Sequence, residues 1–368
     1  MSVFARSAAF APLAACTLLA DPFEPVALHR ESGLEGERAA DAGITDAGRS
    51  SATAPVCSGD EESSVVGSDC SQAVDFESQG SMRPISDAGL PADGSGSPGS
   101  VCPPGWAAFG APELVSTGLV SNGNLFGPAL SADGLRLYFS VSSPGSEQIY
   151  TATRQAQGTA VFSDASELGA LNSPALEGSP FESFDGRRIY FFSNRRGGVG
   201  NRDLWFSEHV DAAFSPPALL GGVNTQSLEH LPWLARDELS IIFVSSRPMD
   251  GDSDLWRATR VSIDAAFGAP VVLTEVNSVS TEGRLVLSSD GLTALFSSNR
   301  SGSVGDADLW TASRADVNGP FSAPSNLTQL NSAAADLDVA LSSDERELFF
   351  ASSRTGVSQI WRSTRDCS

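Results

Sequence analysis

Short apolar segments separated by polar turns follow one another from about residue 105 to residue 365, and no stretch has the spacing of an amphipathic helix. In one cycle, an apolar segment over residues 179–184 reaches an Asp185-Gly186 turn, and the aromatic-rich segment 189–192 returns from it. A Gly-rich loop then leads to residues 203–205, which end in Trp, and a fourth segment starts at Phe214. Asp-Gly between apolar segments is typical of a hairpin, because the turn needs positive φ angles that Gly adopts freely. The cycle therefore predicts a four-stranded antiparallel sheet.

This cycle occurs five times, and its turns are separated by 52, 52, 53 and 54 residues. The turn positions are Asp133-Gly134, Asp185-Gly186, Asp237-Glu238, Asp290-Gly291 and Asp344-Glu345. A repeat of this length is typical of a propeller or a solenoid. Such a sheet needs neighbours on both faces, and a ring provides them without leaving long exposed edges. We therefore predict an all-β protein that folds as a five-bladed β-propeller.

The two ends of the repeat region are expected to build the last blade together. The fourth segment begins with Phe and has Leu six residues later, at Phe162, Phe214, Phe267 and Phe321. A copy one residue shorter begins at Phe109, ahead of the first complete cycle, whereas the last cycle ends after residues 360–365 without one. An N-terminal strand is therefore expected to complete the last blade.

Two cysteines fall where this closure lacks a covalent loop. By alignment with blade three, Cys367 takes the place of Ser262 and Cys102 that of Arg260, so the two thiols are expected to meet. A disulfide between Cys102 and Cys367 would close a very long loop and contribute on the order of 4 kcal/mol in a chain-entropy description.

The first hundred residues differ in composition from the repeats. Residues 1–20 hold Arg6, a short apolar run and the box Leu13-Ala14-Ala15-Cys16, which resembles a bacterial lipoprotein signal whose Cys is lipidated. An ordinary secretory signal and a misassigned start are the alternatives. Residues 21–100 carry fifteen Asp or Glu against four Arg, with almost no aromatics, so we expect a disordered acidic linker. Residues 101–368 then form the propeller.

The lipoprotein resemblance sets expectations for the compartment and for the other cysteines. In such lipoproteins a residue other than Asp after the Cys, here Thr17, implies the outer membrane, with the chain facing the periplasm or the cell surface. With Cys16 consumed by lipid, an even number of cysteines remains, which suits an oxidising compartment. Cys57 and Cys70 then pair by elimination, and membrane contact is expected only through the anchor.

The charge of the chain limits its partners. The formal net charge is −22, and every basic residue apart from His is Arg. Such an acidic chain lacks the positive surface that binds nucleic acid or anionic lipid. The absence of Lys also excludes Schiff-base and P-loop chemistry. We expect no cofactor and a monomer.

Short motifs around the turns and the third strands recur between blades. They include Leu130-Ser131-Ala132-Asp133-Gly134, then Ser193-Asn194-Arg195 with Asp203-Leu204-Trp205, and Ser298-Asn299-Arg300 with Asp308-Leu309-Trp310. These segments resemble the WD40-like propeller repeat of the TolB family, over about residues 105–365. The resemblance implies a propeller fold and an envelope location. The chain departs from the family at five positions where Pro is common, namely Ala132, Phe184, Arg236, Ser289 and Ser343.

Three further polar positions recur in blades two to five at fixed distances from the turn Asp. Thirteen residues before it stand Asn172, Asn224, Asn277 and Asn331, eight before it Glu177, Glu229, Glu282 and Asp336, and ten after it Arg195, Arg247, Arg300 and Arg354. Blade one has Val120, Leu125 and Ser143 instead. The acid and the Arg are lost together and an unpaired buried charge is costly, so we expect a structural Arg-to-carboxylate clamp. The alternative is a binding face near the channel mouth that complements a cationic peptide or protein segment.

Blade three carries two further candidates. The alternating residues Asp250, Asp252 and Asp254 can supply oxygens to Ca²⁺, although Asp, Gly and Ser are also ordinary turn residues. His230 is expected to be a hydrogen-bonded residue at the start of a strand, and Trp233 a core residue. The other histidines are His29 and His209, so no nucleophile-His-acid set is visible.

The sequence favours an exported envelope propeller that binds a protein, a peptide or a glycan. The alternative is a carbohydrate-active hydrolase, because five-bladed rings host glycosidases, which need two carboxylates about 5 to 10 Å apart. The carboxylates available for this are Glu177, Glu229, Glu282 and Asp336. Catalytic residues normally break a repeat whereas these obey it, so we predict a binding module and no enzyme.

Overall fold

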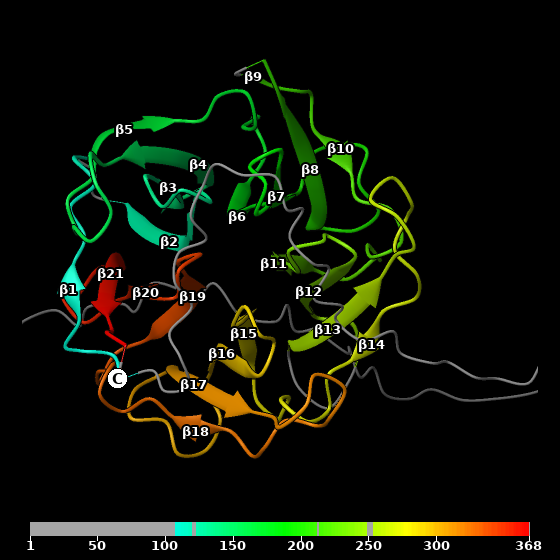
Figure 1. Cartoon of the computed structure of the whole chain (residues 1–368). Helices are drawn as coiled ribbons and strands as arrows, with labels where there is room; N and C mark the ends of the chain where they lie inside the picture. The colour runs from blue at the N-terminus through cyan, green and yellow to red at the C-terminus, as the bar shows by residue number, and fades with distance from the viewer. Residues whose placement is uncertain (1–106, 120–122, 212, 249–252, 368) are drawn as a thin grey trace, which may run out of the picture. The chain divides into compact units, whose positions relative to one another are not determined.

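Five antiparallel sheets stand around a common axis, and the innermost strand of each sheet lies next to that axis (Figure 1). The computed structural model describes residues 107–119, 123–211, 213–248 and 253–367, and the predicted five-bladed β-propeller is confirmed within them. Every regular element of these residues is a strand, and no helix among them is long and apolar enough to cross a membrane.

The strands of each blade follow one another from the axis outward in chain order, except where the N-terminus enters blade five. Blade one contains β2 (Asn124–Leu130), β3 (Arg136–Ser143), β4 (Ser146–Thr153) and β5 (Ser163–Glu167). Blade two contains β6 (Glu177–Glu182), β7 (Arg188–Ser193), β8 (Asp203–Val210), β9 (Ala213–Phe214) and β10 (Ala218–Leu219). Blade three contains β11 (Glu229–Leu234), β12 (Ser240–Ser245), β13 (Asp254–Thr259) and β14 (Val271–Val272). Blade four contains β15 (Glu282–Leu287), β16 (Thr293–Ser298), β17 (Asp308–Ser313) and β18 (Ser325–Asn326), and blade five contains β19 (Asp336–Leu341), β20 (Glu347–Ser352), β21 (Gln359–Thr364) and β1 (Glu113–Leu114).

The outermost strands are shorter than the sequence pattern predicts. In blades two to five the fourth segment contains Pro, and the strand is limited to two residues beyond it, as at Pro217 and β10. Proline has no N–H to donate to a neighbouring strand, which explains the short ladder. Blade one has no Pro in this segment, and its β5 is five residues long. Blade two adds β9, which pairs with an extension of β8.

Asp closes the first hairpin of each blade. Asp133 Oδ1 accepts hydrogen bonds from Leu135 N (2.9 Å) and Ser131 Oγ (2.6 Å), and the turn Asp of blades two, four and five is bound in the same way. The next residue has positive φ, which suits Gly134. Glu238 and Glu345 adopt the same left-handed conformation, at φ 54° and 61°, in blades three and five.

The predicted closure by the N-terminal strand is confirmed. β1 pairs antiparallel with β21, and Leu114 lies opposite Trp361. In Figure 1 the two strands, at opposite ends of the described chain, lie side by side. Upstream of the strand, Gly110 N donates to Thr364 O at 2.8 Å, which extends the contact between the two ends.

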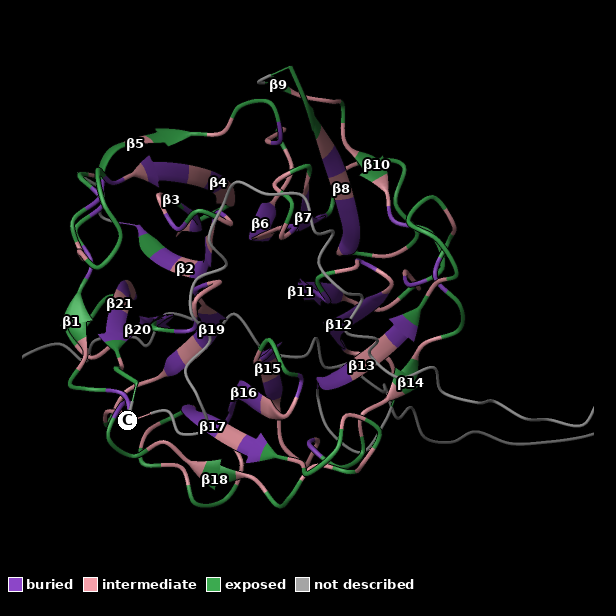
Figure 2. Cartoon of the chain, viewed as in Figure 1, coloured by how far each residue is buried: buried purple, intermediate pink, exposed green. Residues whose placement is uncertain are grey.

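The core lies between the inner strands of neighbouring blades. Figure 2 shows the inner and middle strands buried and β1, β5, β10, β14 and β18 exposed or half-buried. Side chains such as Phe139, Phe243 and Phe296 on the second strands are fully buried. Trp233, expected in the core, is buried as well.

Several predictions concern residues that the structure does not describe. The lipoprotein signal, Cys16, the linker 21–100, Cys57, Cys70 and Cys102 lie outside the described residues. Cys367 is described just after β21, where Ala107 N donates to Asp366 O (3.1 Å), so Ala107 lies next to this end of the chain. The pairing of Cys102 with Cys367 stays a prediction.

Candidate functional site

The recurring arginines and carboxylates lie against each other in blades two to five, as their joint occurrence predicts. The ion pairs are Arg195–Glu177 (3.1 Å), Arg247–Glu229 (3.1 Å), Arg300–Glu282 (2.9 Å) and Arg354–Asp336 (2.5 Å). The acid begins the innermost strand, and the Arg follows the second strand. We call this pair the carboxylate clamp.

Each clamp carboxylate is also bound by its own blade. Glu229 accepts hydrogen bonds from Thr225 N (2.9 Å), Thr225 Oγ1 (2.6 Å) and Ser245 Oγ (2.9 Å) in addition to Arg247. The Arg247 guanidinium lies between two aromatic rings, with its Cζ 5.4 Å from the centroid of Phe243 and 4.7 Å from that of Trp256. The side chains of all four acids are 0 % exposed. The geometry therefore supports a structural role for the clamp, because a partner in solvent cannot reach these carboxylates.

The recurring asparagines connect neighbouring blades. Asn224 Oδ1 accepts from Leu204 N (2.7 Å), and its Nδ2 donates to Leu204 O (3.0 Å), so the side chain pairs with the third strand of the preceding sheet. Asn172, Asn277 and Asn331 make the same pair of bonds with Ile149, Leu255 and Leu309. These amides are likewise engaged with protein backbone.

A second recurring Arg escaped the sequence analysis. Arg154, Arg260, Arg314 and Arg365 each lie 4.5 to 4.9 Å over the Phe that opens a fourth segment. Their Nε atoms donate to a carbonyl of the first hairpin turn of their own blade. The loop between the second and third strands varies in length, so counting from the turn Asp hides this Arg. It stands four residues after Tyr150, Trp256, Trp310 and Trp361, and counting from that aromatic residue reveals it.

Charges that do not recur gather near the axis of the ring. Every innermost strand has a bulge near its start. Two residues after the clamp acid, or after Leu125 in blade one, the innermost strands carry Gly127, Ser179, Leu231, Arg284 or Asp338, so only β15 and β19 place a charge there. Arg284 Nη1 donates to Pro128 O (2.8 Å) on β2 and its Nη2 to Pro180 O (3.2 Å) on β6, so this side chain crosses the axis from blade four to blades one and two.

Four more charged or titratable side chains belong to the same non-recurring group as Arg284. Asp338 accepts from Gly127 N (3.0 Å), and the Glu147 carboxylate lies 3.6 Å from the Arg202 guanidinium across the seam between blades one and two. His230 is buried, with its ring edge-on to Phe192. We call Glu147, Arg202, His230, Arg284 and Asp338 the axial cluster.

Burial shifts the pKa values in the axial cluster. It raises the pKa of Glu147 to about 7, against the opposing effect of Arg202, and raises that of Asp338, against Arg284. Burial, reinforced by Arg202 and Arg284, lowers the pKa of His230 to about 3, so its imidazole is neutral at neutral pH. The cluster thus holds two acids whose ionisation is disfavoured next to two cations.

The candidate Ca²⁺ loop is only partly described. Asp250 and Asp252 lie outside the described residues, and Asp254 begins β13 as a buried residue. Within the described ranges, no group of three His, Cys, Asp or Glu side chains is placed to hold a metal ion. The Ca²⁺ site stays a prediction.

Comparison with known proteins gives similarity at the level of fold. No protein-family model matches the chain, and no curated protein matches it. Among solved structures, an α-L-arabinofuranosidase from Podospora anserina, in complex with cellotriose, has a TM-score of 0.50 at 12 % identity, covering 73 % of this chain and 99 % of that one. A TolB-like protein from Agrobacterium tumefaciens has a TM-score of 0.42 at 18 % identity, covering 67 % of this chain and 78 % of that one.

A third similar structure, TolB from Acinetobacter baumannii, has a TM-score of 0.39 at 17 % identity, covering 67 % of this chain and 56 % of that one. At such identities the likeness concerns the fold alone. The propeller is shared by proteins of different function, so the function has to be argued from this chain's own side chains.

Proposed function

We propose that this chain is an exported binding module of the cell envelope, and that the axial cluster recognises a charged segment of a protein or peptide partner. The observation that carries the proposal is the contrast between recurring and non-recurring charges. The recurring acids are enclosed in clamps, whereas the axial cluster breaks the repeat and reaches the surface through Glu147 and Arg202, whose side chains are 15 % and 26 % exposed.

Charges of both signs in a partly desolvated setting favour selective recognition. An approaching group would meet Arg202 and Glu147 at the surface, with Arg284 and Asp338 buried in the same cluster, and a wrong charge is rejected by repulsion. Glu147 fits tightly against blade two, because a Cβ atom on Gly178 would lie only 2.5 Å from its Oε1. The acid is therefore held in a defined position, which reduces the ordering cost of binding.

Site-specific photo-crosslinking of the full chain in its own envelope tests this proposal. A crosslinking residue replaces Ser146, at the start of β4, and a control replaces the exposed Asp164 on the outer strand β5. We expect one partner adduct from position 146 that Arg202→Ala removes, and no such adduct from position 164. An adduct that forms equally from both positions, or survives Arg202→Ala, contradicts the proposal.

A hydrolase acting on carbohydrate is the second candidate, and the raised pKa values of Glu147 and Asp338 favour it. A carboxyl group with a pKa near neutrality can act as a general acid beside a second carboxylate. The similar structure from Podospora anserina is an α-L-arabinofuranosidase, so aryl arabinofuranosides are the first substrates to test. Turnover that is lost in both Glu147→Gln and Asp338→Asn supports the hydrolase, and absence of turnover leaves the binding module.

Export and anchoring are part of the proposal. The box ending in Cys16 would give a lipid-anchored protein of the outer membrane, with the acidic linker between anchor and propeller. Incorporation of labelled palmitate that disappears in Cys16→Ala is the expected result. A labelled Cys16→Ala protein, or an unlabelled natural chain, contradicts the anchor and leaves the axial cluster unaffected.

A further inference from the structure

The seam between blades two and three contains a three-member polar contact. Tyr190 OH on β7 donates a hydrogen bond to the carboxylate of Glu238 in the first turn of blade three. Arg260, the residue after β13, places its Nη2 3.8 Å from Glu238 Oε2 and donates from Nε to Glu238 O at 2.8 Å. Both charged side chains are 4 % exposed, so a tyrosine, a carboxylate and a guanidinium together fill this seam.

The seam between blades one and two repeats the first two members. Tyr138 OH on β3, at the position equivalent to Tyr190, donates to Glu182 Oε1 at 2.7 Å, and Ala132 N donates to Glu182 Oε2 at 3.2 Å. Glu182 ends β6 at a place where every other blade has Leu, namely Leu130, Leu234, Leu287 and Leu341. Blade two therefore departs from the repeat by placing a carboxylate at this seam.

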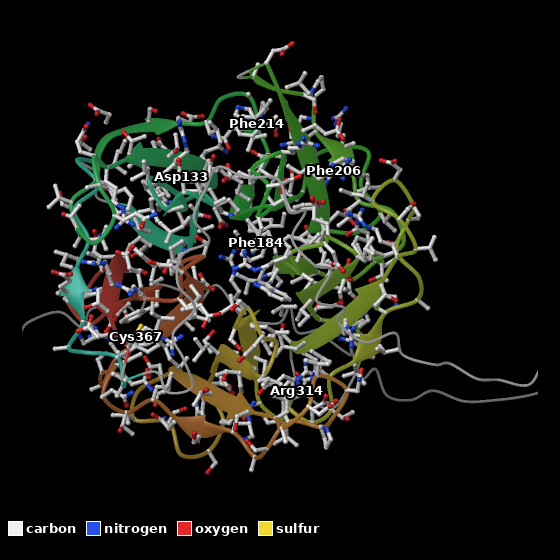
Figure 3. All side chains as sticks on the ribbon, in the orientation of Figure 1. Asp133, Phe184, Phe206, Phe214, Arg314 and Cys367 are labelled. Atoms are coloured by element: carbon white, nitrogen blue, oxygen red, sulfur yellow. The ribbon has the colours of Figure 1, made fainter. Side chains whose placement is uncertain are left out.

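The third member is absent from this seam. The residue equivalent to Arg260 is His209, an exposed residue whose ring stacks on Phe214 with centroids 4.8 Å apart. Phe214 is labelled in Figure 3, on blade two, as is Asp133 on the neighbouring blade one. Among the described residues, no Arg or His nitrogen lies within 4.0 Å of the Glu182 carboxylate, and burial raises the pKa of this acid.

A hollow lies at the seam between blades one and two. This hollow of about 480 Å³ is lined by Asp133, Tyr138, Glu182, Gly186 and His209 among others. We call it the seam hollow. The size is that of a small-molecule or side-chain pocket. In the next seam, the backbone carbonyl of Glu238 accepts a hydrogen bond from Arg260 Nε. Gly186 occupies the equivalent turn position in blade two, so its backbone carbonyl is the equivalent acceptor.

We propose that the seam hollow binds the guanidinium group of a ligand, which takes the position that Arg260 occupies in the next seam. The planar fork of a guanidinium matches a carboxylate and donates to a carbonyl at the same time, whereas an ammonium group presents only a point charge. The tyrosine and carboxylate are already held together by their own hydrogen bond. The site is distinct from the axial cluster and does not rest on the function proposed above.

The two arginines that also line the hollow do not satisfy Glu182. Arg154 is bound on both sides of its guanidinium by Glu347 and also donates to Gly134 O and Thr159 O. Arg136 is exposed and begins β3 at the rim. A ligand cation would therefore meet a half-buried carboxylate that forms no ion pair within 4.0 Å with a described residue, although the more distant Arg136 acts against the burial that raises its pKa.

Titration of the full chain with small guanidinium compounds tests the proposal. The probes are butylguanidinium, N-acetyl-arginine amide, and butylammonium as the ammonium control of equal charge, and binding is followed by calorimetry or by NMR of His209. We expect saturable binding of the guanidinium probes in the millimolar range or tighter, and butylammonium binding weaker by ~10-fold. Tighter binding of the arginine amide than of butylguanidinium identifies a peptide Arg as the source, and the reverse identifies a free small molecule.

Two variants test whether the probes bind in the seam hollow. Glu182→Leu installs the residue of the four other blades, and His209→Arg installs their guanidinium, so both are expected to fold. Each is expected to weaken binding of the probes by ~10-fold or more, since hydrogen bonds to charged groups are lost or blocked. Asp264→Asn, which removes an exposed carboxylate elsewhere on blade three, is the control and leaves binding unchanged.

Three results overturn the proposal. The first is no saturable binding of either guanidinium probe up to about 10 mM. The second is binding that persists unchanged in His209→Arg, which decides the matter even where Glu182→Leu is poorly folded. The third is equal affinity for butylammonium, because the seam hollow would then recognise charge without the geometry of a guanidinium.

Discussion

Blade three is made from one continuous stretch of chain, whereas blade five is assembled from the two ends of the propeller, yet the outer strand is held in the same way in both. In blade three, Gly268 N donates to Thr259 O at 2.8 Å. In blade five, Gly110 N donates to Thr364 O at the same distance, although 254 positions separate these residues in the sequence. The position of a residue within the blade, and not the covalent connection, decides its contacts.

The stacking contact of the outer strand follows the same rule. Arg260 Cζ lies 4.5 Å from the ring centroid of Phe267 within blade three. Arg365 Cζ lies 4.6 Å from that of Phe109, which comes from the other end of the chain. A Phe that precedes the first full repeat thus occupies the place that the repeat prescribes.

Blade five differs by carrying additional ion pairs. Arg362 on β21 pairs with Glu113 on β1 (2.5 Å) and with Glu347 on β20 (2.6 Å). Glu347 in turn pairs with Arg154 of blade one, and both of these side chains are at most 5 % exposed. This row of charges links the closing strand to its own blade and to blade one. In the continuous blades, a covalent loop connects the outer strand to the rest of the blade.

Removing the Phe that anchors the outer strand is expected to affect blade five more than blade three. Phe109→Ala is expected to lower the free energy of unfolding by about 4 kcal/mol, because a buried ring and its stacking contact with Arg365 are lost. The matched change Phe267→Ala in blade three is expected to cost less, since the loop keeps β14 near β13. Chemical denaturation measures both, and hydrogen exchange of the Val115 amide, which donates to Ile360 O, reports the release of β1. Equal losses in the two blades would show that the loop contributes nothing.

The predicted disulfide between Cys102 and Cys367 would supply the covalent link that blade five lacks. We expect Cys102→Ser to lower the free energy of unfolding by roughly 4 kcal/mol under oxidising conditions, on the chain-entropy estimate for a very long loop. The difference from the natural chain should vanish in reductant. Peptide mapping without reduction that finds either thiol free sinks this prediction.

Most of the fold was predictable from the sequence because the repeat states it five times. The turn Asp, the closing Phe109 and the clamp pair Arg247 with Glu229 all obey fixed spacings, and each lies where the spacing predicts. The Pro-limited outer strands were missed, although Pro217 carries the signal. The shape of the axial cluster was out of reach, since Arg284 and Asp338 occur once each and their contacts come from other blades.

The seam hollow shows a different limit of sequence analysis. Glu182 breaks a column of Leu residues, and aligned repeats reveal that substitution. Its partner Tyr138 lies on the neighbouring blade, 44 residues away, and the hollow beside the two side chains forms only when the blades pack together. Spacing identifies the exception, and only packing shows what surrounds it.

The carboxylate clamp allows a closer comparison of the two blades, because both of its members come from one continuous stretch of chain in each blade. Arg247 in blade three donates from Nε to Ser245 Oγ (3.0 Å) and from Nη2 to Val223 O (2.7 Å), and Arg354 in blade five makes the equivalent bonds. Arg247→Ala and Arg354→Ala should therefore each cost about 3 kcal/mol, since each leaves a buried carboxylate unpaired. Thermal and chemical unfolding measure both.

The two clamp variants are expected to lose similar amounts of stability, because the two arginines make equivalent hydrogen bonds and ion pairs. A much larger loss for Arg354→Ala would mean that chain ends weaken the whole of blade five. An unchanged melting temperature for Arg247→Ala together with lost partner binding would reverse the assignment of the clamp to structure.

The smallest effect is expected at the exposed end of the row of charges. Glu113 pairs with Arg362 but is 56 % exposed, so solvent and salt screen the interaction. Glu113→Gln should therefore change the free energy of unfolding by less than ~1 kcal/mol, and the change should shrink further in high salt. Urea denaturation at low and high ionic strength measures it. A loss as large as that of a clamp arginine would show that the ion pair, and not Phe109 and the backbone bonds, holds the closing strand in blade five.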